Sequence, residues 1–490
     1  MSDADLQTVP IRPGPSARQT LRPTSARPPS LRPETWVEQA RALIVLALPL
    51  VASQLAQMGL LTTDVVFLGR LSTHALASAA IGNTVYYFAW LIGTGPASAV
   101  APMVSHIVGH KVDERARDRA GVRGVARMGL WAVALVSAPL MLVLLSARPI
   151  LIHLGQEPAL AAGAGQFVAM LCFGLPFSLG FQVLRNFTTA LGRPAVALWV
   201  MAVAVGWNVV ADYALIFGHF GAPRLGLAGA GLATSSSAIF AFIALFAAIQ
   251  LTPSLRAYRL LRRVHRPHWP KFTELVRLGG PIGATMIFEA MLFNSTTLLV
   301  GSFGADAVAA HQIALNFCSL TFMVPLGMAM AAAVRVGRFA GSGDMAQARR
   351  AGQTAMALAV AFMLMSGAGL LLFGRGIAGL YVAGRSAADL QAIGLAVVFL
   401  RIAAAFQVFD GLQVIAAFSL RGLKDARAPM LLAGASYWLV GAPCCIWLGL
   451  GLGWRGVGVW IGLAVGLAVA ALTLCSRFLL LTRRREMGGG

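Results

Sequence analysis

Twelve apolar stretches, each about 20 residues long and separated by short polar breaks, constrain this chain more than any other feature. A helix of that length crosses the hydrocarbon core of a bilayer, which is about 30 Å thick. Charged residues make up only 12% of the chain, against about a quarter in soluble proteins. The sequence therefore predicts an all-α polytopic membrane protein with twelve transmembrane helices. The predicted spans are 42–68, 75–107, 125–147, 159–184, 195–217, 226–252, 278–301, 307–334, 352–374, 390–420, 428–450 and 456–476.

The placement of the basic residues predicts the orientation of these spans. The formal net charge of +21 would suggest a nucleic-acid partner if the basic residues formed one patch. Instead, 32 of the 39 Lys and Arg residues fall in the two termini or in, or within three residues of, the loops on the same side as the termini. By the positive-inside rule both termini are cytoplasmic, and we expect no nucleic-acid partner. No cleavable signal peptide precedes Trp36, so we expect the first span to direct the chain to an inner or plasma membrane.

The second half of the chain repeats the first at a nearly constant offset. The matching pairs include Pro49 with Pro281, Gly69 with Gly301, Ala75 with Ala307, Gln182 with Gln413 and Phe187 with Phe418. Six spans per copy is an even number, so both copies enter the membrane in the same orientation. A parallel repeat of this kind has its pseudo-twofold axis along the membrane normal. We expect two six-helix lobes with a cavity between them.

The repeat divides the chain into five segments. Residues 1–35 are rich in Pro and Arg and have no periodic apolar pattern, which predicts a disordered cytoplasmic tail. The N-lobe is predicted at 36–252 and the C-lobe at 278–476. A basic cytoplasmic linker, 253–277, joins the lobes, and a cytoplasmic C-terminal tail occupies 477–490.

Four acidic residues lie inside predicted spans: Asp64, Asp212, Glu289 and Asp410. A charge at mid-membrane costs about 3 kcal/mol, so such a residue should face a cavity, pair with a cation or hold a proton. At about 1.5 Å per residue, Asp64 and Asp212 lie roughly 27 to 33 Å from the cytoplasmic ends of their spans, and Glu289 and Asp410 about 17 to 18 Å. Each lobe then owns one carboxylate pair that could bind H⁺ or Na⁺. The alternative is a set of neutral acids that only hydrogen-bond neighbouring helices.

Other residues near these acids have two readings each. Asn208 lies one helical turn before Asp212, so its amide either adds an oxygen ligand for Na⁺ or bonds a neighbouring helix. Pro49 removes a backbone hydrogen bond from the first span and acts either as a hinge or as a packing kink. Residues around the central acids either line an apolar substrate cleft or pack in the core: Phe288, Phe293, Phe406, Phe409 and Gln413.

The motifs, in their order on twelve spans, resemble the multidrug and toxic compound extrusion (MATE) family, and its NorM branch in particular. They are Thr63-Asp64 after Pro49, Asn208-x-x-x-Asp212, Phe288-Glu289, His311-Gln312-Ile313-Ala314-Leu315-Asn316, Arg335-Val336-Gly337, Asp410-x-x-Gln413 and Leu420-Arg421-Gly422-x-Lys424-Asp425. The similarity runs from about residue 40 to 480.

This resemblance implies a function. It implies an antiporter that expels organic cations and other amphipathic compounds in exchange for H⁺ or Na⁺, by alternating access between two lobes. It also implies cation sites at Asp64, Asn208 and Asp212 in the N-lobe and at Glu289 and Asp410 in the C-lobe. One departure is Phe406, since relatives often carry tyrosine at this position, four residues before Asp410. A missing hydroxyl favours protons over sodium in the C-lobe.

Two other functions compete with this one. A flippase of lipid-linked oligosaccharides has similar duplicated lobes, but its site would need cationic residues for a pyrophosphate. An integral-membrane enzyme would need a catalytic motif, and neither a His-x-x-x-x-Asp pair nor a zinc-protease His-Glu-x-x-His occurs in the sequence. We therefore expect no enzyme activity, no cofactor and no metal beyond Na⁺ at the coupling residues. The expected partners are small organic cations and membrane lipid, and the expected state is a monomer.

Overall fold

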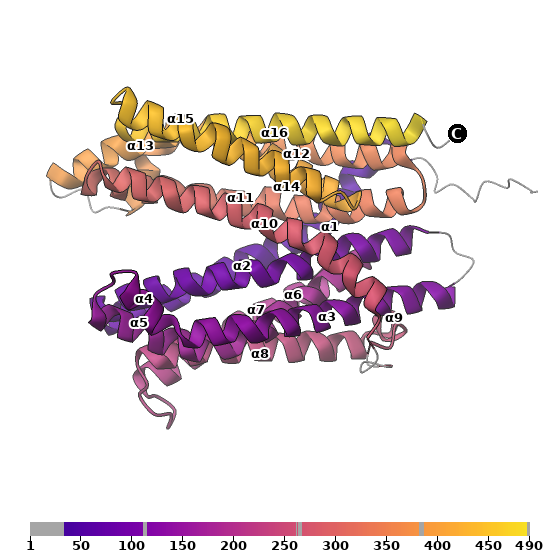
Figure 1. Cartoon of the computed structure of the whole chain (residues 1–490), viewed down its shortest axis with the longest axis horizontal. Coiled ribbons are helices and arrows are strands. Elements are labelled where there is room, and N and C mark those ends of the chain that lie inside the picture. The colour runs from indigo at the N-terminus through magenta and orange to yellow at the C-terminus, as the bar shows by residue number, and fades with distance from the viewer. Residues whose placement is uncertain (1–33, 111–114, 261, 263–266, 382–386, 488–490) are drawn as a thin grey trace, which may run out of the picture. The chain divides into compact units, whose positions relative to one another are not determined.

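The computed structural model describes residues 34–110, 115–260, 262, 267–381 and 387–487. Within these residues, twelve helices are long and apolar enough to cross a membrane. They run side by side as long rods, and no strand occurs in the described part of the chain (Figure 1). The predicted class, an all-α polytopic membrane protein with twelve spans, is confirmed.

The first six spans come from seven helices, with the short α4 between the third and fourth spans and α9 in the linker. Their bounds are α1 (Trp36–Leu71), α2 (Thr73–Gly109), α3 (Arg115–Leu145), α4 (Ala147–His153), α5 (Pro158–Leu171), α6 (Leu175–Ala190), α7 (Pro194–Phe217), α8 (Leu227–Leu251) and α9 (Pro253–Arg256).

The second six spans begin with α10. Their bounds are α10 (Trp269–Gly301), α11 (Ala305–Gly341), α12 (Met345–Tyr381), α13 (Ala387–Gly422), α14 (Arg427–Ala435), the π-helical turn η3 (Ser436–Gly441), α15 (Ala442–Ile446), a second π-helical turn η4 (Trp447–Gly451) and α16 (Arg455–Met487).

The first helix begins at a capping box. The Oγ1 atom of Thr35 accepts a hydrogen bond from the backbone nitrogen of Glu38 at 3.3 Å, and the Glu38 carboxylate accepts one from the Thr35 nitrogen at 2.8 Å. From there α1 continues without a break through Pro49. Apart from Glu34 and Thr35, the predicted tail 1–35 lies outside the described residues.

Several helices differ from the predicted spans. The fourth span is two helices, α5 and α6, joined by a 3₁₀ turn at Cys172–Gly174, because Pro176 in the first turn of α6 cannot donate to the preceding helix. This span also runs past its predicted end at 184, as far as Ala190. In addition, α10 begins at Trp269 inside the predicted linker, and the expected C-terminal tail is helical as far as Met487.

The two halves meet through a symmetric pair of helix crossings. Helix α2 packs on α10, and α11 packs on α1. Both crossings are close because each has a glycine at its centre: a Cβ at Gly95 of α2 would lie 2.5 Å from the Gly279 carbonyl oxygen, and one at Gly327 of α11 would lie 2.8 Å from the Val51 nitrogen. Gly95 and Gly327 occupy equivalent positions in the two copies of the repeat, in the same register as Pro49 and Pro281. Small residues that let backbones approach are typical of helix contacts in lipid.

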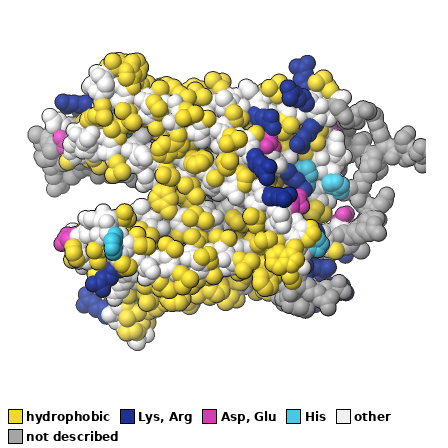
Figure 2. Space-filling view, in the orientation of Figure 1, with side chains coloured by type: hydrophobic (Ala, Val, Ile, Leu, Met, Phe, Trp, Pro, Cys, Tyr) yellow, Lys and Arg dark blue, Asp and Glu magenta, His cyan; other side chains and the backbone are white. Residues whose placement is uncertain are grey.

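Polar contacts between the halves gather at the end of the helices that holds the linker. His106 of α2 hydrogen-bonds the Gly422 carbonyl oxygen at 2.9 Å. Gln39 of α1 donates to the Gln347 side-chain oxygen at 2.9 Å, and Arg335 of α11 pairs with Glu34. Figure 2 shows many of the visible Lys and Arg side chains at this same end, while hydrophobic side chains cover much of the middle. An apolar band with one basic end is the surface that a bilayer-spanning protein presents.

Candidate functional site

In the N-lobe, the structure brings Asp64, Asn208 and Asp212 together. Asn208 and Asp212 lie one turn apart on α7, so both face α1, which carries Asp64. With its amide nitrogen turned toward the acids, Asn208 donates to Asp64 Oδ1 and to Asp212 Oδ2, both at 3.2 Å. Thr234 of α8 donates from its hydroxyl to Asp64 Oδ2 at 2.9 Å. We call these four residues the N-lobe cluster, and all but the half-buried Thr234 are buried.

The N-lobe cluster has more acceptors than donors. Asp64 and Asp212 share the single amide of Asn208, at 3.2 Å from each, and ionised carboxylates only accept hydrogen bonds. The Oδ1 atom of Asp212 is buried and receives no hydrogen bond. A buried acceptor without a donor costs about 1 to 3 kcal/mol, and more when it is charged. The arrangement can therefore gain free energy by taking up a proton or a small cation.

In the C-lobe, Gln413 connects two of the functional groups. From α13, its amide nitrogen donates to Glu289 Oε1 of α10 at 3.1 Å and lies 2.6 Å from the phenol oxygen of Tyr437. Tyr437 belongs to the π-helical turn η3, and such turns often mark functional sites. Asp410 lies three residues before Gln413 on α13 and close enough to Glu289 for the two charges to interact. We call Glu289, Asp410, Gln413 and Tyr437 the C-lobe cluster.

The C-lobe cluster repeats the imbalance of the N-lobe cluster. Asp410 is 7% exposed, and its Oδ1 atom receives no hydrogen bond. Among the described residues, no Lys or Arg forms an ion pair with Asp64, Asp212, Glu289 or Asp410. The N-lobe thus holds two buried acids and the C-lobe holds the buried Asp410 with the half-buried Glu289, and in each lobe one acid has an oxygen left without a donor.

The predicted aromatic cleft residues do not share one environment. Phe406 is 1% exposed and packs edge-to-face against Phe293 at 6.2 Å and Trp460 at 5.6 Å, measured between ring centroids. These contacts place Phe406 in the core of the C-lobe. Phe288, Phe293 and Phe409 are only partly buried, at the margin of that core. The phenol near Glu289 comes from Tyr437, on another helix.

Two basic residues that the sequence suggested to be in loops are buried inside helices. Arg421 lies in α13 with its guanidinium 4.1 Å from the centre of the Phe418 ring, and its charge acts on Glu289. Arg185 lies in α6 and donates to Gln54 at 2.7 Å and to Gln182 at 2.9 Å. Arg401, which the sequence places closest to Asp410 within a span, is exposed.

Sequence reasoning missed Thr234 and Tyr437. Thr234 opens a run of four hydroxyl residues, 234–237, within an otherwise apolar span, and that run is a usable signal. Tyr437 is one of only six tyrosines, but a single phenol in a span does not reveal its partner. Thr234 contacts Asp64 from a helix 170 residues away in the sequence, and Tyr437 contacts Gln413 from the next span, 24 residues further on.

Comparison with known proteins gives a family match in both halves. The chain matches the MatE family over residues 49–214 and again over 281–447. The two matched segments start at the equivalent prolines Pro49 and Pro281, in agreement with the repeat seen in the sequence.

Curated relatives match along nearly the whole chain. The probable multidrug resistance protein NorM of Mesorhizobium japonicum is 42% identical over 91% of this chain and 94% of its own length. The multidrug resistance protein NorM of Burkholderia vietnamiensis is 39% identical over 94% of this chain and 97% of its own length.

Solved structures share the fold at lower identity. The eukaryotic MATE transporter AtDTX14 superimposes with a TM-score of 0.79 at 23% identity, over 92% of this chain and 98% of that one. An outward-facing MATE family multidrug transporter of the MOP superfamily gives a TM-score of 0.80 at 20% identity, over 91% of this chain and 96% of that one.

Proposed function

Since the chain belongs to the MatE family, we propose that it exports organic cations and other amphipathic drugs in exchange for H⁺ or Na⁺. It is a membrane transporter and not an enzyme. The multidrug names of its relatives support drug export over the alternative of flipping a lipid-linked oligosaccharide. The acidic character of both clusters also favours cationic substrates over a pyrophosphate.

The observation that carries this proposal is the unpaired oxygen in each acidic cluster. Asp212 Oδ1 and Asp410 Oδ1 are buried without a donor, and among the described residues they are the only carboxylate oxygens of which this is true. A proton or Na⁺ bound there would neutralise the cluster and satisfy that oxygen. An organic cation would compete for the same negative charge, and this competition is the basis of exchange.

Either ion fits the chemistry of the clusters. The N-lobe cluster offers carboxylate, amide and hydroxyl oxygens from α1, α7 and α8, a donor set that suits a hard cation such as Na⁺. In the C-lobe, Tyr437 supplies a phenol beside Gln413, so the absence of a hydroxyl at Phe406 no longer argues against sodium there. Each chain carries both clusters, and we therefore propose that a monomer is the functional unit.

We further propose alternating access in an inner or plasma membrane, with both termini cytoplasmic. The polar contacts between the halves, such as His106 with Gly422, gather at the linker end, which supports a state closed on the cytoplasmic side. A cysteine at exposed Arg193 should then be shielded from an impermeant thiol reagent in intact cells, whereas one at exposed Glu157 should react. Labelling of Arg193→Cys from outside would reverse the proposed orientation.

The test of coupling uses purified protein in proteoliposomes with an imposed H⁺ or Na⁺ gradient and a fluorescent organic cation as substrate. We expect Asp212→Asn and Asp410→Asn to insert and fold normally but to lose gradient-driven export, because the amide keeps the volume and removes the exchangeable charge. Glu157→Gln is the matched control, since Glu157 is an exposed acid outside both clusters. Gradient-driven export by both Asn variants at the control rate would refute the carboxylate mechanism.

A further inference from the structure

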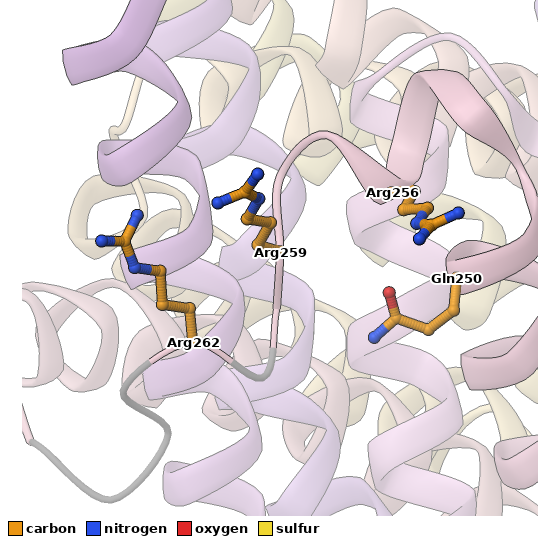
Figure 3. Close-up of a pocket in the computed structure, with 4 residues that line it drawn as sticks. All are labelled: Gln250, Arg256, Arg259 and Arg262. Atoms are coloured by element: carbon orange, nitrogen blue, oxygen red, sulfur yellow. The ribbon is translucent and has the colours of Figure 1, made fainter.

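A cavity of about 420 Å³ opens beside the linker, at the end of α8. Its walls are formed by Gln250 from the last turn of α8 and by Arg256, Arg259 and Arg262 from α9 and the turns that follow (Figure 3). We call it the arginine cavity. The coupling mechanism described above uses none of its residues.

The backbone presents the three arginines at regular intervals. The Arg259 nitrogen donates to the Arg256 carbonyl oxygen at 3.0 Å, and the Arg262 nitrogen donates to the Arg259 carbonyl oxygen at 2.9 Å. Arginine thus occurs at every third residue, and each of the two consecutive turns joins one arginine to the next. Arg259 has a φ of 49°, in the left-handed region that few residues other than glycine occupy. Strain of this kind persists where the surroundings hold it, and it is concentrated at functional sites.

Apolar residues between the arginines anchor this backbone to the N-lobe. Leu255 and Leu260 are buried in the N-lobe core, at 1% and 5% exposure. The Tyr258 ring packs edge-to-face on Phe187 with centroids 5.7 Å apart, and burial raises the pKa of the Tyr258 phenol, so it stays neutral at physiological pH. These residues hold the backbone of this part of the linker in place, and the three arginines are exposed.

The charge of the arginine cavity is not balanced by the described residues. None of the three guanidinium groups forms an ion pair or a side-chain hydrogen bond within the part of the chain that the structure describes. In Figure 3, the Arg259 and Arg262 side chains extend toward the same side of the loop, and Arg256 lies near Gln250. Guanidinium groups bind phosphate oxygens in bidentate geometry, so clustered arginines match a phosphate group.

An exposed apolar side chain beside the cavity distinguishes between phosphate-bearing ligands. Leu251, the last residue of α8, is 81% exposed and lines an adjoining hollow together with Pro253, Arg256 and Arg259. A free phosphate ion would gain nothing from this leucine. A phospholipid would gain from both features, because its phosphate would meet the arginines while its acyl chain meets Leu251 and the apolar face of α8.

We propose that the arginine cavity is a binding site for the phosphate headgroup of an anionic phospholipid. Basic pockets at the cytoplasmic ends of transmembrane helices bind such headgroups, and the cytoplasmic leaflet supplies them. The site goes beyond the proposed export function, because it lies on the linker between the lobes and away from both acidic clusters.

The test measures lipid binding to the purified full-length chain in a neutral detergent. Fluorescent phosphatidylglycerol is titrated and its anisotropy followed, with phosphatidylcholine and inorganic phosphate as competitors. The variant is Arg256→Gln with Arg259→Gln and Arg262→Gln. The matched control, Arg193→Gln with Arg483→Gln and Arg484→Gln, removes the same charge from exposed arginines outside the cavity.

We expect the cavity variant to bind phosphatidylglycerol at least about ten-fold more weakly than the wild type, and the control less than about two-fold more weakly. We also expect phosphatidylcholine and millimolar inorganic phosphate to compete poorly. Equal losses in the two triple variants would overturn the proposal, since binding would then follow net charge alone. Competition by inorganic phosphate as strong as that by the lipid would also overturn it, and would indicate a site for free anions.

A second variant guards against misfolding of the first. Replacing Arg256, Arg259 and Arg262 with lysine keeps the charge and removes the bidentate geometry, so an intermediate loss of affinity is expected. Wild-type affinity in a folded lysine variant would exclude a specific guanidinium–phosphate contact. Transport is not the readout, so failure of this proposal and failure of the export proposal are distinguishable.

Discussion

The crossing of α2 on α10 should tolerate no side chain at Gly279. A Cβ there would lie 2.7 Å from Pro96 Cα and 2.8 Å from the Pro96 nitrogen, both of which are backbone atoms. Ordinary carbon contacts are about 3.5 to 4.0 Å, so the two helices would have to separate by roughly 1 Å. Overpacking of this kind costs about 1 to 3 kcal/mol.

The neighbouring residue provides a matched control. A Cβ at Gly280 would meet no atom within 4 Å, on the same helix and in the same sequence context. Both Gly279→Ala and Gly280→Ala gain up to about 1 kcal/mol of helix propensity, which cancels in the comparison. The difference in stability between the two variants should therefore be about 1 to 3 kcal/mol.

The assay is thermal unfolding in detergent, followed by the fluorescence of the ten tryptophans at one fixed scan rate. We expect Gly279→Ala to unfold several degrees below Gly280→Ala. Gly327→Ala should lose about as much, because its Cβ would lie 2.5 Å from Val51 Cγ2 at the equivalent crossing. Indistinguishable unfolding of Gly279→Ala and Gly280→Ala would refute the reasoning and show that the halves are loosely packed.

Two further variants test single oxygens of the acidic clusters. Thr234→Val removes a hydroxyl oxygen, 2.9 Å from Asp64, from the donor set proposed for Na⁺, and since a bond to a charged group contributes about 1.5 to 3 kcal/mol, the Na⁺ concentration for half-maximal Na⁺-driven export should rise about ten-fold or more. Thr473→Val is its control, because that hydroxyl bonds only to carbonyl oxygens of its own helix, and an equal shift in both would rule out an ion-binding role. Tyr437→Phe removes the phenol oxygen that lies 2.6 Å from the Gln413 nitrogen, and we expect a similar weakening of Na⁺-driven export; an unchanged Na⁺ response would show that this phenol is not a ligand.

The spans could be predicted from the sequence because the length of an apolar stretch is a local property. Their ends could not, because a helix can continue past the apolar core. For this reason Arg185 and Arg421, which follow the predicted ends of their spans, were expected in loops although both lie inside helices. Hydropathy reports where lipid begins and not where the backbone stops being helical.

The acidic clusters were partly predictable. Asn208 and Asp212 share a face of one helix, and helical periodicity is enough to place them together. Thr234 and Tyr437 join the clusters only through contacts between separate helices, 170 residues apart in the chain for Thr234 with Asp64 and 24 for Tyr437 with Gln413. The sequence contains their side chains but not the helix contacts that bring them to Asp64 and to Gln413.

The paired glycine crossings also bear on how such a chain could arise. The first helix of each half packs on the second helix of the other half, which is the isologous arrangement of a symmetric homodimer. A half-length chain with these two helices exposed would associate with a second copy of itself through two identical helix crossings. Fusing the copies through the linker raises their effective concentration without changing these crossings. Once they are fused, the sequence of each copy can diverge independently, and the acidic positions have diverged. Asp64 in the first copy corresponds to Thr296 in the second. Glu289 in the second copy corresponds to Gln57 in the first.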